Sequence, residues 1–131
     1  MKDRKQQVIA VINSTIDVVD ILEICLQDEG YNTVGGLIPD FKRGQKDMVA
    51  FMEEHRPDLI VWDIAPPYEQ NVIFLKMVRN MRVMENVKWI FTTTNKAALA
   101  KTSESIEAHE IIGKPMDLEV IINLVKTTLA K

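Results

Sequence analysis

Apolar residues recur along the chain in two alternating patterns. Five short runs, rich in β-branched and aromatic residues, have the length and composition of buried strands. They lie at residues 8–12, 31–37, 59–62, 88–92 and 111–113. Between these runs, apolar residues return every three or four positions, which is typical of helices with one buried face. The pattern predicts helices in the intervals, among them a polar helix around residues 96–107, and a last helix after residue 115.

Local signals predict where several of these helices begin and end. Ser14, with Asp17 three residues later, resembles a capping box for the first helix, and Gly30 is expected to end it. Asp117 is expected to cap the last helix. Residues 38–44 hold Pro, Asp and Gly in a short space, which predicts a loop. The apolar positions assigned to the face of the first helix are Val18, Ile21, Leu22, Cys25 and Leu26.

Strands and helices alternate five times, which predicts an α/β fold with a parallel sheet covered on both faces. The arrangement expected is a doubly wound, flavodoxin-like (βα)5 domain with strand order 2-1-3-4-5. With 131 residues, the chain is long enough for one domain with a substantial core. We therefore expect a single domain over residues 1–131.

Composition limits the classes of partner. The net charge is −3 and basic residues are scattered among acids, so no footprint for a nucleic-acid backbone is present and direct DNA or RNA binding is not expected. The single cysteine, Cys25, cannot form an internal disulfide. The polar start MKDRKQQ lacks the apolar segment of a signal peptide, and no long apolar span suggests a membrane helix. A soluble, cytoplasmic protein is expected.

Polar residues follow four of the predicted strands. Asn13 and Ser14 follow the first, Asp63 and Thr92 end the third and fourth, and Lys114 follows the fifth. The carboxyl ends of these strands converge in the expected topology, so the four positions should surround one shallow pocket. Asp63 alone could be a nucleophile, a metal ligand or simply the cap of a turn. Beside a hydroxyl and an ammonium group, its carboxylate would form a reasonable phosphoryl site.

With these residues in place, the chain resembles a response-regulator receiver domain of the CheY-like superfamily. The resemblance spans residues 8–129 and rests on Asp63 in LIVWDIAPP, Thr92 in WIFTT and Lys114 in IIGKP. It implies that Asp63 is the phosphoacceptor, Thr92 the switch hydroxyl and Lys114 the phosphoryl contact, with a cis bond between Lys114 and Pro115. A histidine kinase or phosphotransfer protein would then be the phosphodonor, and a downstream protein the target.

One departure from the receiver pattern concerns the metal. Receivers place two acids after the first strand to help hold Mg²⁺, whereas this chain has Asn13 and Ser14 there. The remaining ligands would be Asp63, the backbone carbonyl of Ala65 and, weakly, the amide oxygen of Asn13. Because Mg²⁺ relies on carboxylates, we expect it to bind poorly. Thr93 and Ile111 also replace a small residue and an aromatic one, so the chain is interpreted as an atypical receiver.

Three functions remain open from the sequence. The first is a phosphoaccepting receiver that controls a partner, and the second a pseudo-receiver that binds proteins without phosphorylation. The third is a flavodoxin-like enzyme or cofactor binder, although the segment NSTID lacks the glycines of a phosphate loop. Enzymatic activity beyond self-phosphorylation at Asp63 is not expected.

The resemblance also implies a surface for protein partners. In receivers, the fourth helix, fifth strand and fifth helix form the usual output and homodimer face. The charged residues expected on this face carry both signs, so they identify no partner: Lys96, Lys101, Glu104, Glu107 and Lys126.

Overall fold

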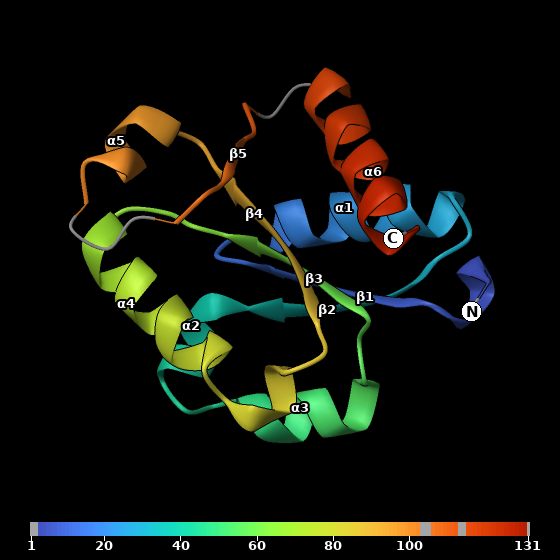
Figure 1. Ribbon diagram of the computed structural model, residues 1–131, viewed down its shortest axis with the longest axis horizontal. Coiled ribbons are helices and arrows are strands. Elements are labelled where there is room, and N and C mark those ends of the chain that lie inside the picture. Colours follow the sequence, from blue (N-terminus) through green and yellow to red (C-terminus); the bar gives the residue numbers. More distant parts are fainter. Residues whose placement is uncertain (1–2, 103–105, 113–114, 131) are drawn as a thin grey trace.

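The computed structural model describes residues 3–102, 106–112 and 115–130, and contains a five-stranded sheet (Figure 1). All neighbouring strands are parallel, and their order is β2-β1-β3-β4-β5. The strands are β1 (Val8–Asn13), β2 (Asn32–Leu37), β3 (Leu59–Asp63), β4 (Lys88–Thr93) and β5 (His109–Glu110). This topology confirms the predicted α/β, flavodoxin-like arrangement.

Helices cover both faces of the sheet (Figure 1). On one face lie α1 (Ile16–Asp28) and α6 (Pro115–Leu129). The opposite face carries α2 (Ile38–Lys42), α3 (Met48–His55), α4 (Tyr68–Arg79) and α5 (Lys96–Ala100). Two single 3-10 turns, η1 (Arg4–Gln6) and η2 (Arg82–Met84), complete the elements of the described chain. None of the helices in the described ranges is long and apolar enough to cross a bilayer.

The central strands are buried on both faces, as their unbroken apolar runs predict. Four residues of β1 and four of β3 are at most 1% exposed. Alternate side chains of these strands contribute to two separate apolar clusters, one under α1 and α6 and the other under α2 to α5. The rigid centre therefore holds the carboxyl ends of β1, β3 and β4 in fixed relative positions.

The loop predicted at residues 38–44 is wrong, because Ile38–Lys42 form the short helix α2. Pro39 lies in its first turn, where a missing N–H does no harm, and Ile38 and Phe41 are buried. Gly36 makes this possible. A Cβ at Gly36 would lie 2.8 Å from the Phe41 ring, so glycine lets α2 pack directly on β2.

Two predicted helix caps are wrong. The residue before α1 is Thr15, not Ser14, and its side chain makes no capping hydrogen bond. Asp117 lies inside α6, where its Oδ2 accepts a hydrogen bond from the backbone N–H of Ile112. The predicted stop at Gly30 is confirmed, since Gly30 has a φ of 96° directly after the last turn of α1.

The region after β4 differs most from the prediction. The fifth strand was expected at residues 111–113 but lies at His109–Glu110, where it pairs with Thr92 and Thr93. His109 is exposed although it lies within the strand. The helix expected over 96–107 is α5, which ends at Ala100. A shorter helix therefore covers the outer part of the sheet.

The expected buried face of α1 is also partly wrong. Val19, Leu22 and Leu26 face the core, whereas Val18 and Ile21 are 39% and 49% exposed. Apolar residues occur around more than half of the circumference of α1. Their spacing along the sequence therefore did not identify the side of the helix that packs on the sheet.

Candidate functional site

Asp63 and Thr92 lie side by side at the carboxyl edge of the sheet. They are directly paired in the register of β3 and β4, and Thr92 Oγ1 donates a hydrogen bond to Asp63 Oδ1 over 2.7 Å. Thr92 is almost fully buried, so its hydroxyl has a fixed position. The structure thus brings together two of the three residues predicted to form a phosphoryl site. Lys114, the third, and its bond to Pro115 lie outside the described residues.

The carboxyl group of Asp63 is in an environment that disfavours its charge. Burial raises the pKa of Asp63 above its ordinary value of 3.8, and the hydrogen bond from Thr92 offsets part of that change. Asp63 is only half-buried, so its outer oxygen faces a pocket. The surroundings of this carboxyl group therefore favour the neutral form more than those of an exposed carboxylate do.

Asn13, predicted as a weak metal ligand, is buried at the end of β1. Its Oδ1 accepts a hydrogen bond from the backbone N–H of Thr15 over 3.2 Å, which fixes the turn into α1. The amide oxygen predicted to reach a metal therefore has a local structural role. Asn13 and Asp63 both line the pocket at this edge, which brings these two predicted site residues together.

The carbonyl of Ala65, the other predicted ligand, is also engaged. Asn71 Nδ2 donates a hydrogen bond to Ala65 O over 2.6 Å, and the ammonium of Lys42 donates one to Asn71 Oδ1. Lys42 comes from α2, so this short chain of contacts ties α2 to the loop after β3. The sequence did not predict the contact of Lys42 with Asn71, because Lys42 belongs to the segment that was predicted to be a loop.

The pocket over Asp63 is largely apolar. It has a volume of about 260 Å³ and lies between α1, α6 and the ends of β1, β3 and β4. Asp117 also contributes to its lining, a second carboxylate whose predicted role was only that of a helix cap. Most of the other lining residues are aliphatic: Val18, Ile21, Leu22, Ile111, Leu118 and Ile121. The site therefore combines two partly buried carboxyl groups, those of Asp63 and Asp117, with an apolar wall.

These residues do not fit a Mg²⁺ site of the receiver type. Within the described ranges, no group of three or more acidic, histidine or cysteine side chains could hold a metal ion. Asn13 and Ala65 already accept hydrogen bonds from the protein, and burial raises the pKa of the Asp63 carboxyl group above its ordinary value. A hard cation that prefers carboxylate oxygens would find too few of them here.

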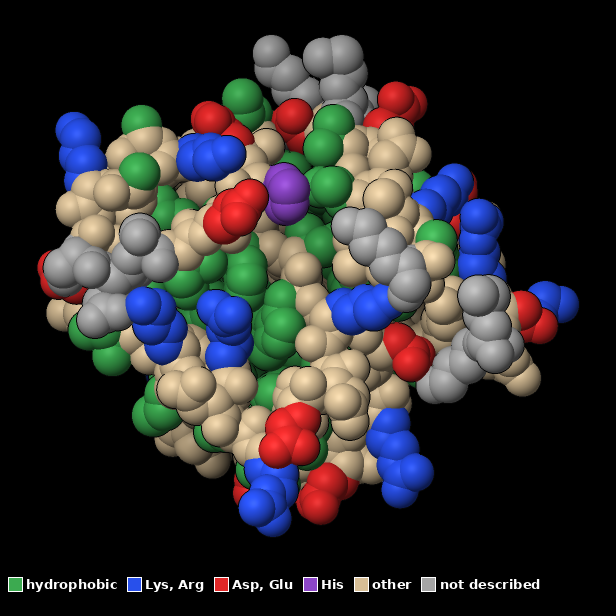
Figure 2. Space-filling view, viewed as in Figure 1, with side chains coloured by type: hydrophobic (Ala, Val, Ile, Leu, Met, Phe, Trp, Pro, Cys, Tyr) green, Lys and Arg blue, Asp and Glu red, His purple; other side chains and the backbone are tan. Residues whose placement is uncertain are grey.

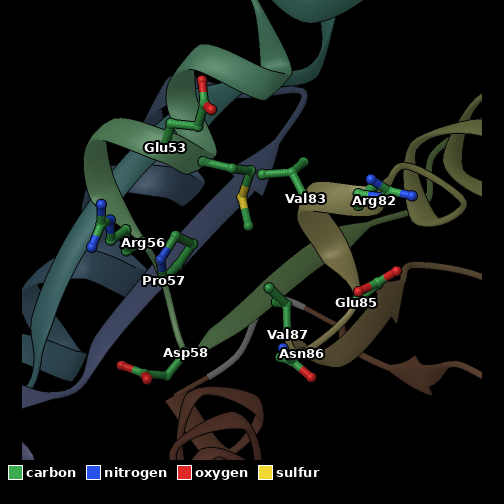
Figure 3. A pocket seen from close by; sticks show the side chains of 10 residues that line it. Glu53, Arg56, Pro57, Asp58, Arg82, Val83, Glu85, Asn86 and Val87 are labelled. Atoms are coloured by element: carbon green, nitrogen blue, oxygen red, sulfur yellow. The ribbon is translucent and has the colours of Figure 1, made fainter.

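A second pocket, at the opposite edge of the sheet, offers no comparable site. It lies between α3 and η2, has a volume of about 410 Å³ and is floored by Met52, Pro57, Val83 and Val87. Figure 3 shows that the charged ends of Glu53, Arg56, Asp58, Arg82 and Glu85 point in different directions around its rim. Because both signs of charge alternate and do not converge, this pocket has no arrangement that would select one ligand.

Comparison with known proteins gives a consistent result for the fold. No protein-family model matches the sequence, and no curated protein matches it closely enough to be called a relative. The chemotaxis protein CheY4 of Vibrio cholerae superposes with a TM-score of 0.67 at 20% identity, over 93% of this chain and 98% of that one.

Two further solved structures show the same similarity. A response regulator from Thermotoga maritima has a TM-score of 0.66 at 13% identity, covering 95% of this chain and 98% of that one. A receiver-modulated diguanylate cyclase from Pelobacter carbinolicus has a TM-score of 0.63 at 16% identity, covering 95% and 92%. With the strand order, the five-fold alternation and the strand-end Asp63, these similarities show that the chain has the CheY-like fold of response-regulator receiver domains.

Proposed function

We propose that this chain is a pseudo-receiver, a signalling module that controls a protein partner by direct binding and without Mg²⁺-dependent phosphorylation. The observation that carries the proposal is the absence of an acid beside Asp63 at the end of β1, where a receiver's metal site has two. Asn13 ends β1 in place of an acid, and its amide oxygen accepts a hydrogen bond from the Thr15 N–H. A partner that recognises the shape of this edge would need no metal.

The contacts around Ala65 support a metal-independent site. In this chain, Asn71 and Lys42 hold the loop after β3 through hydrogen bonds that end on the Ala65 carbonyl. These bonds provide an internal anchor for the loop, where a receiver of the usual type relies on a bound cation. The loop position that a partner meets is therefore built into the fold.

The surface around the pocket supports a protein as the partner. Two exposed aliphatic side chains of α1, Val18 and Ile21, line the pocket over Asp63. Further exposed aliphatic side chains lie on α1, just before α6 and on α6: Ile16, Ile24, Ile112 and Val120. Each is at least 39% exposed. Clustered exposed apolar residues mark protein interfaces more often than free surface. The helix α1 also carries four acids and no Lys or Arg, so a complementary partner would present apolar and cationic side chains.

A phosphoaccepting receiver is the second candidate, and the 2.7 Å contact between Thr92 and Asp63 favours it. In that case an Asp63 oxygen attacks the phosphorus of an acyl phosphate. The new P–O bond forms on Asp63 as the bond to the donor breaks, and the donor leaves as its carboxylate with the electron pair. With a histidine kinase or phosphotransfer protein as the donor, the bond broken would be the P–N bond of a phosphohistidine, and the imidazole would leave with the electron pair. The attacking form is the carboxylate, and burial, which raises the pKa of Asp63, makes that form less favourable than it is in an exposed aspartate.

One experiment separates the two candidates. The native chain is incubated with acetyl phosphate and Mg²⁺, and its intact mass is measured beside that of an Asp63→Asn control. The pseudo-receiver proposal predicts no phosphoryl mass gain in either chain. The double variant Asn13→Asp with Ser14→Asp should gain one phosphoryl group, since it restores two carboxylates beside Asp63. A gain in the native chain that depends on Asp63 would overturn the proposal.

The homodimer and output face predicted from the resemblance corresponds to α5, β5 and α6, and it stays a prediction. Lys96, Lys101 and Glu107 are exposed there, and Glu104 lies outside the described residues. Lys126 instead contacts Glu29 at the end of α1, with 2.5 Å between Nζ and Oε1. Lys126 therefore takes part in the packing of α6 against α1.

A further inference from the structure

Within the described residues, the outer edge of β4 is paired with another strand only near its carboxyl end. The strand runs from Lys88 to Thr93, yet β5 provides partners only for Thr92 and Thr93. Figure 1 shows β5 beside the end of β4 while the rest of β4 continues past it. Trp89, Ile90 and Phe91 of β4 therefore pair with no residue of β5. An edge of this kind presents main-chain groups to which another strand can pair.

A groove follows this open edge. It has a volume of about 550 Å³. One side is formed by three residues of β4, Trp89, Ile90 and Phe91, and the other by Ile106, Glu107 and His109. Lys76 and Arg79 of α4 also line it. The side chain of Ile90 is buried in the cluster on the opposite face of the sheet. Its presence in the lining places the groove along the backbone edge of β4 as well as over its aromatic face.

The floor of the groove is aromatic and only partly covered. The rings of Trp89 and Phe91 stack with centroids 5.5 Å apart, and both side chains are intermediate in exposure. Figure 2 shows the corresponding hollow, with hydrophobic side chains inside it and cationic side chains beside it. The helix that would cover this part of the sheet was predicted to reach residue 107, but α5 ends at Ala100. The groove exists because that helix is short.

Two cationic side chains of α4, Lys76 and Arg79, line one side of the groove. Lys76 and Arg79 lie one turn apart on α4, and the guanidinium carbon of Arg79 is 5.3 Å from the centre of the Phe91 ring. Arg79 is exposed and forms no ion pair within the described part of the chain. A carboxylate entering the groove from the side of α4 would find a planar donor already placed over the aromatic floor.

We propose that this groove binds an extended acidic peptide of a protein partner, which adds to the sheet as a strand alongside β4. Its main chain pairs with the open edge of β4, an apolar side chain packs on Trp89 and Phe91, and a carboxylate side chain pairs with Arg79. An extended peptide matches the groove better than a helix does, because the unpaired edge supplies backbone donors and acceptors. The groove lies on the face of the sheet opposite α1 and α6, so this interaction does not depend on Asp63.

The test is a selection of random peptides, displayed on phage, on the full chain, followed by affinity measurements on the selected peptides by fluorescence anisotropy. Selected sequences should alternate apolar residues and carry an acid. Their affinity should fall at least about tenfold on Arg79→Glu, the order of a lost close charge pair. Arg79→Ala should weaken binding less. Arg82→Glu makes the same charge change at an exposed position of η2 and should leave affinity unchanged.

Hydrogen exchange locates the bound peptide. Protection of the backbone amides of residues 89–91 on peptide addition is the expected result. The proposal is overturned if no peptide is enriched, if Arg79→Glu and Arg82→Glu bind the selected peptides equally, or if protection falls elsewhere. Analytical sedimentation of the chain without peptide tests whether a second copy of the chain fills the groove instead. A concentration-dependent dimer that Arg79→Glu abolishes would show that it does, and would overturn the peptide proposal.

Discussion

Thr92 donates a hydrogen bond to Asp63 across adjacent strands, with 2.7 Å between Oγ1 and Oδ1. The two residues are paired in the register of β3 and β4, so the contact follows directly from the sheet. In this arrangement the carboxyl group has a protein partner before any ligand is present. The partly buried acid, the hydroxyl and the apolar wall of the pocket form one unit whose properties can be measured by substitution.

The raised pKa of Asp63 predicts a particular pH dependence of stability. The folded chain holds the Asp63 proton more tightly than the unfolded chain, so its contribution to stability is full below pH 3.8 and is lost as pH rises through the folded pKa. Asn at this position carries no charge and can still accept the Thr92 hydrogen bond. Asp63→Asn should therefore have the higher melting temperature at pH 7, and thermal melts should show the difference shrinking toward pH 3.8. An equal difference at both pH values would contradict this.

Glu29 should show the opposite dependence. Its hydrogen bond and charge contact with Lys126 lower the pKa of Glu29 below its ordinary value of 4.5. Stability from this group is present above pH 4.5 and declines as pH falls through the lower folded pKa. Glu29→Gln should melt slightly below the native chain at pH 7 and match it in acid. Because the pair is solvent-exposed, 0.5 M salt should also reduce the difference; a salt-independent difference would point to another cause.

The fold was largely predictable because its information lies in short apolar runs. Strands such as β1 and β3 are buried on both faces, and their unbroken apolar sequences have few alternative interpretations. The strand-end positions of Asp63 and Thr92 followed from the same runs. Sequence reasoning therefore located the edge of the sheet and two of the groups that meet there.

The errors came from contacts that no local pattern encodes. Residues 38–44 carry loop-forming residues, yet burial of Phe41 against Gly36 stabilises a helix there. The strand at His109–Glu110 contains polar residues and is specified by pairing with β4 rather than by its own composition. The Lys42, Asn71 and Ala65 contacts join three distant segments, so only the folded structure could show them.

Substitution of Thr92 should separate hydrogen bonding from packing. Thr92→Val keeps the shape of the side chain and removes the donor, leaving a half-buried carboxyl group without this partner. We expect a loss of about 1 kcal/mol in the free energy of unfolding, the usual size of such a bond. Urea denaturation of the native chain, Thr92→Val, Asp63→Asn and the double variant gives the coupling energy between the two sites. A coupling energy of zero would mean that the hydrogen bond does not stabilise the fold.

The close approach of α2 to β2 predicts a large effect of a small substitution. A Cβ at Gly36 would lie 2.8 Å from Phe41 and 3.1 Å from Ile12, both buried. Gly36→Ala should lower the free energy of unfolding by about 1–3 kcal/mol, as overpacking of a core does. Gly44→Ala is a useful comparison: it meets no atom within 4 Å and instead introduces strain at a φ of 76°. Combining Gly36→Ala with Phe41→Leu should recover part of the loss if the clash is the cause.

The central claim is that the edge around Asp63 works without a metal-assisted phosphoryl site, and NMR with beryllofluoride and Mg²⁺ tests it most directly. This mimic of a phosphoryl group binds a receiver carboxylate only when the metal site is functional. We predict that the amide signals of Asp63, Thr92 and Ala65 stay unchanged in the native chain and shift in the Asn13→Asp, Ser14→Asp double variant. Saturable shifts of these signals in the native chain, absent from Asp63→Asn, would contradict the account.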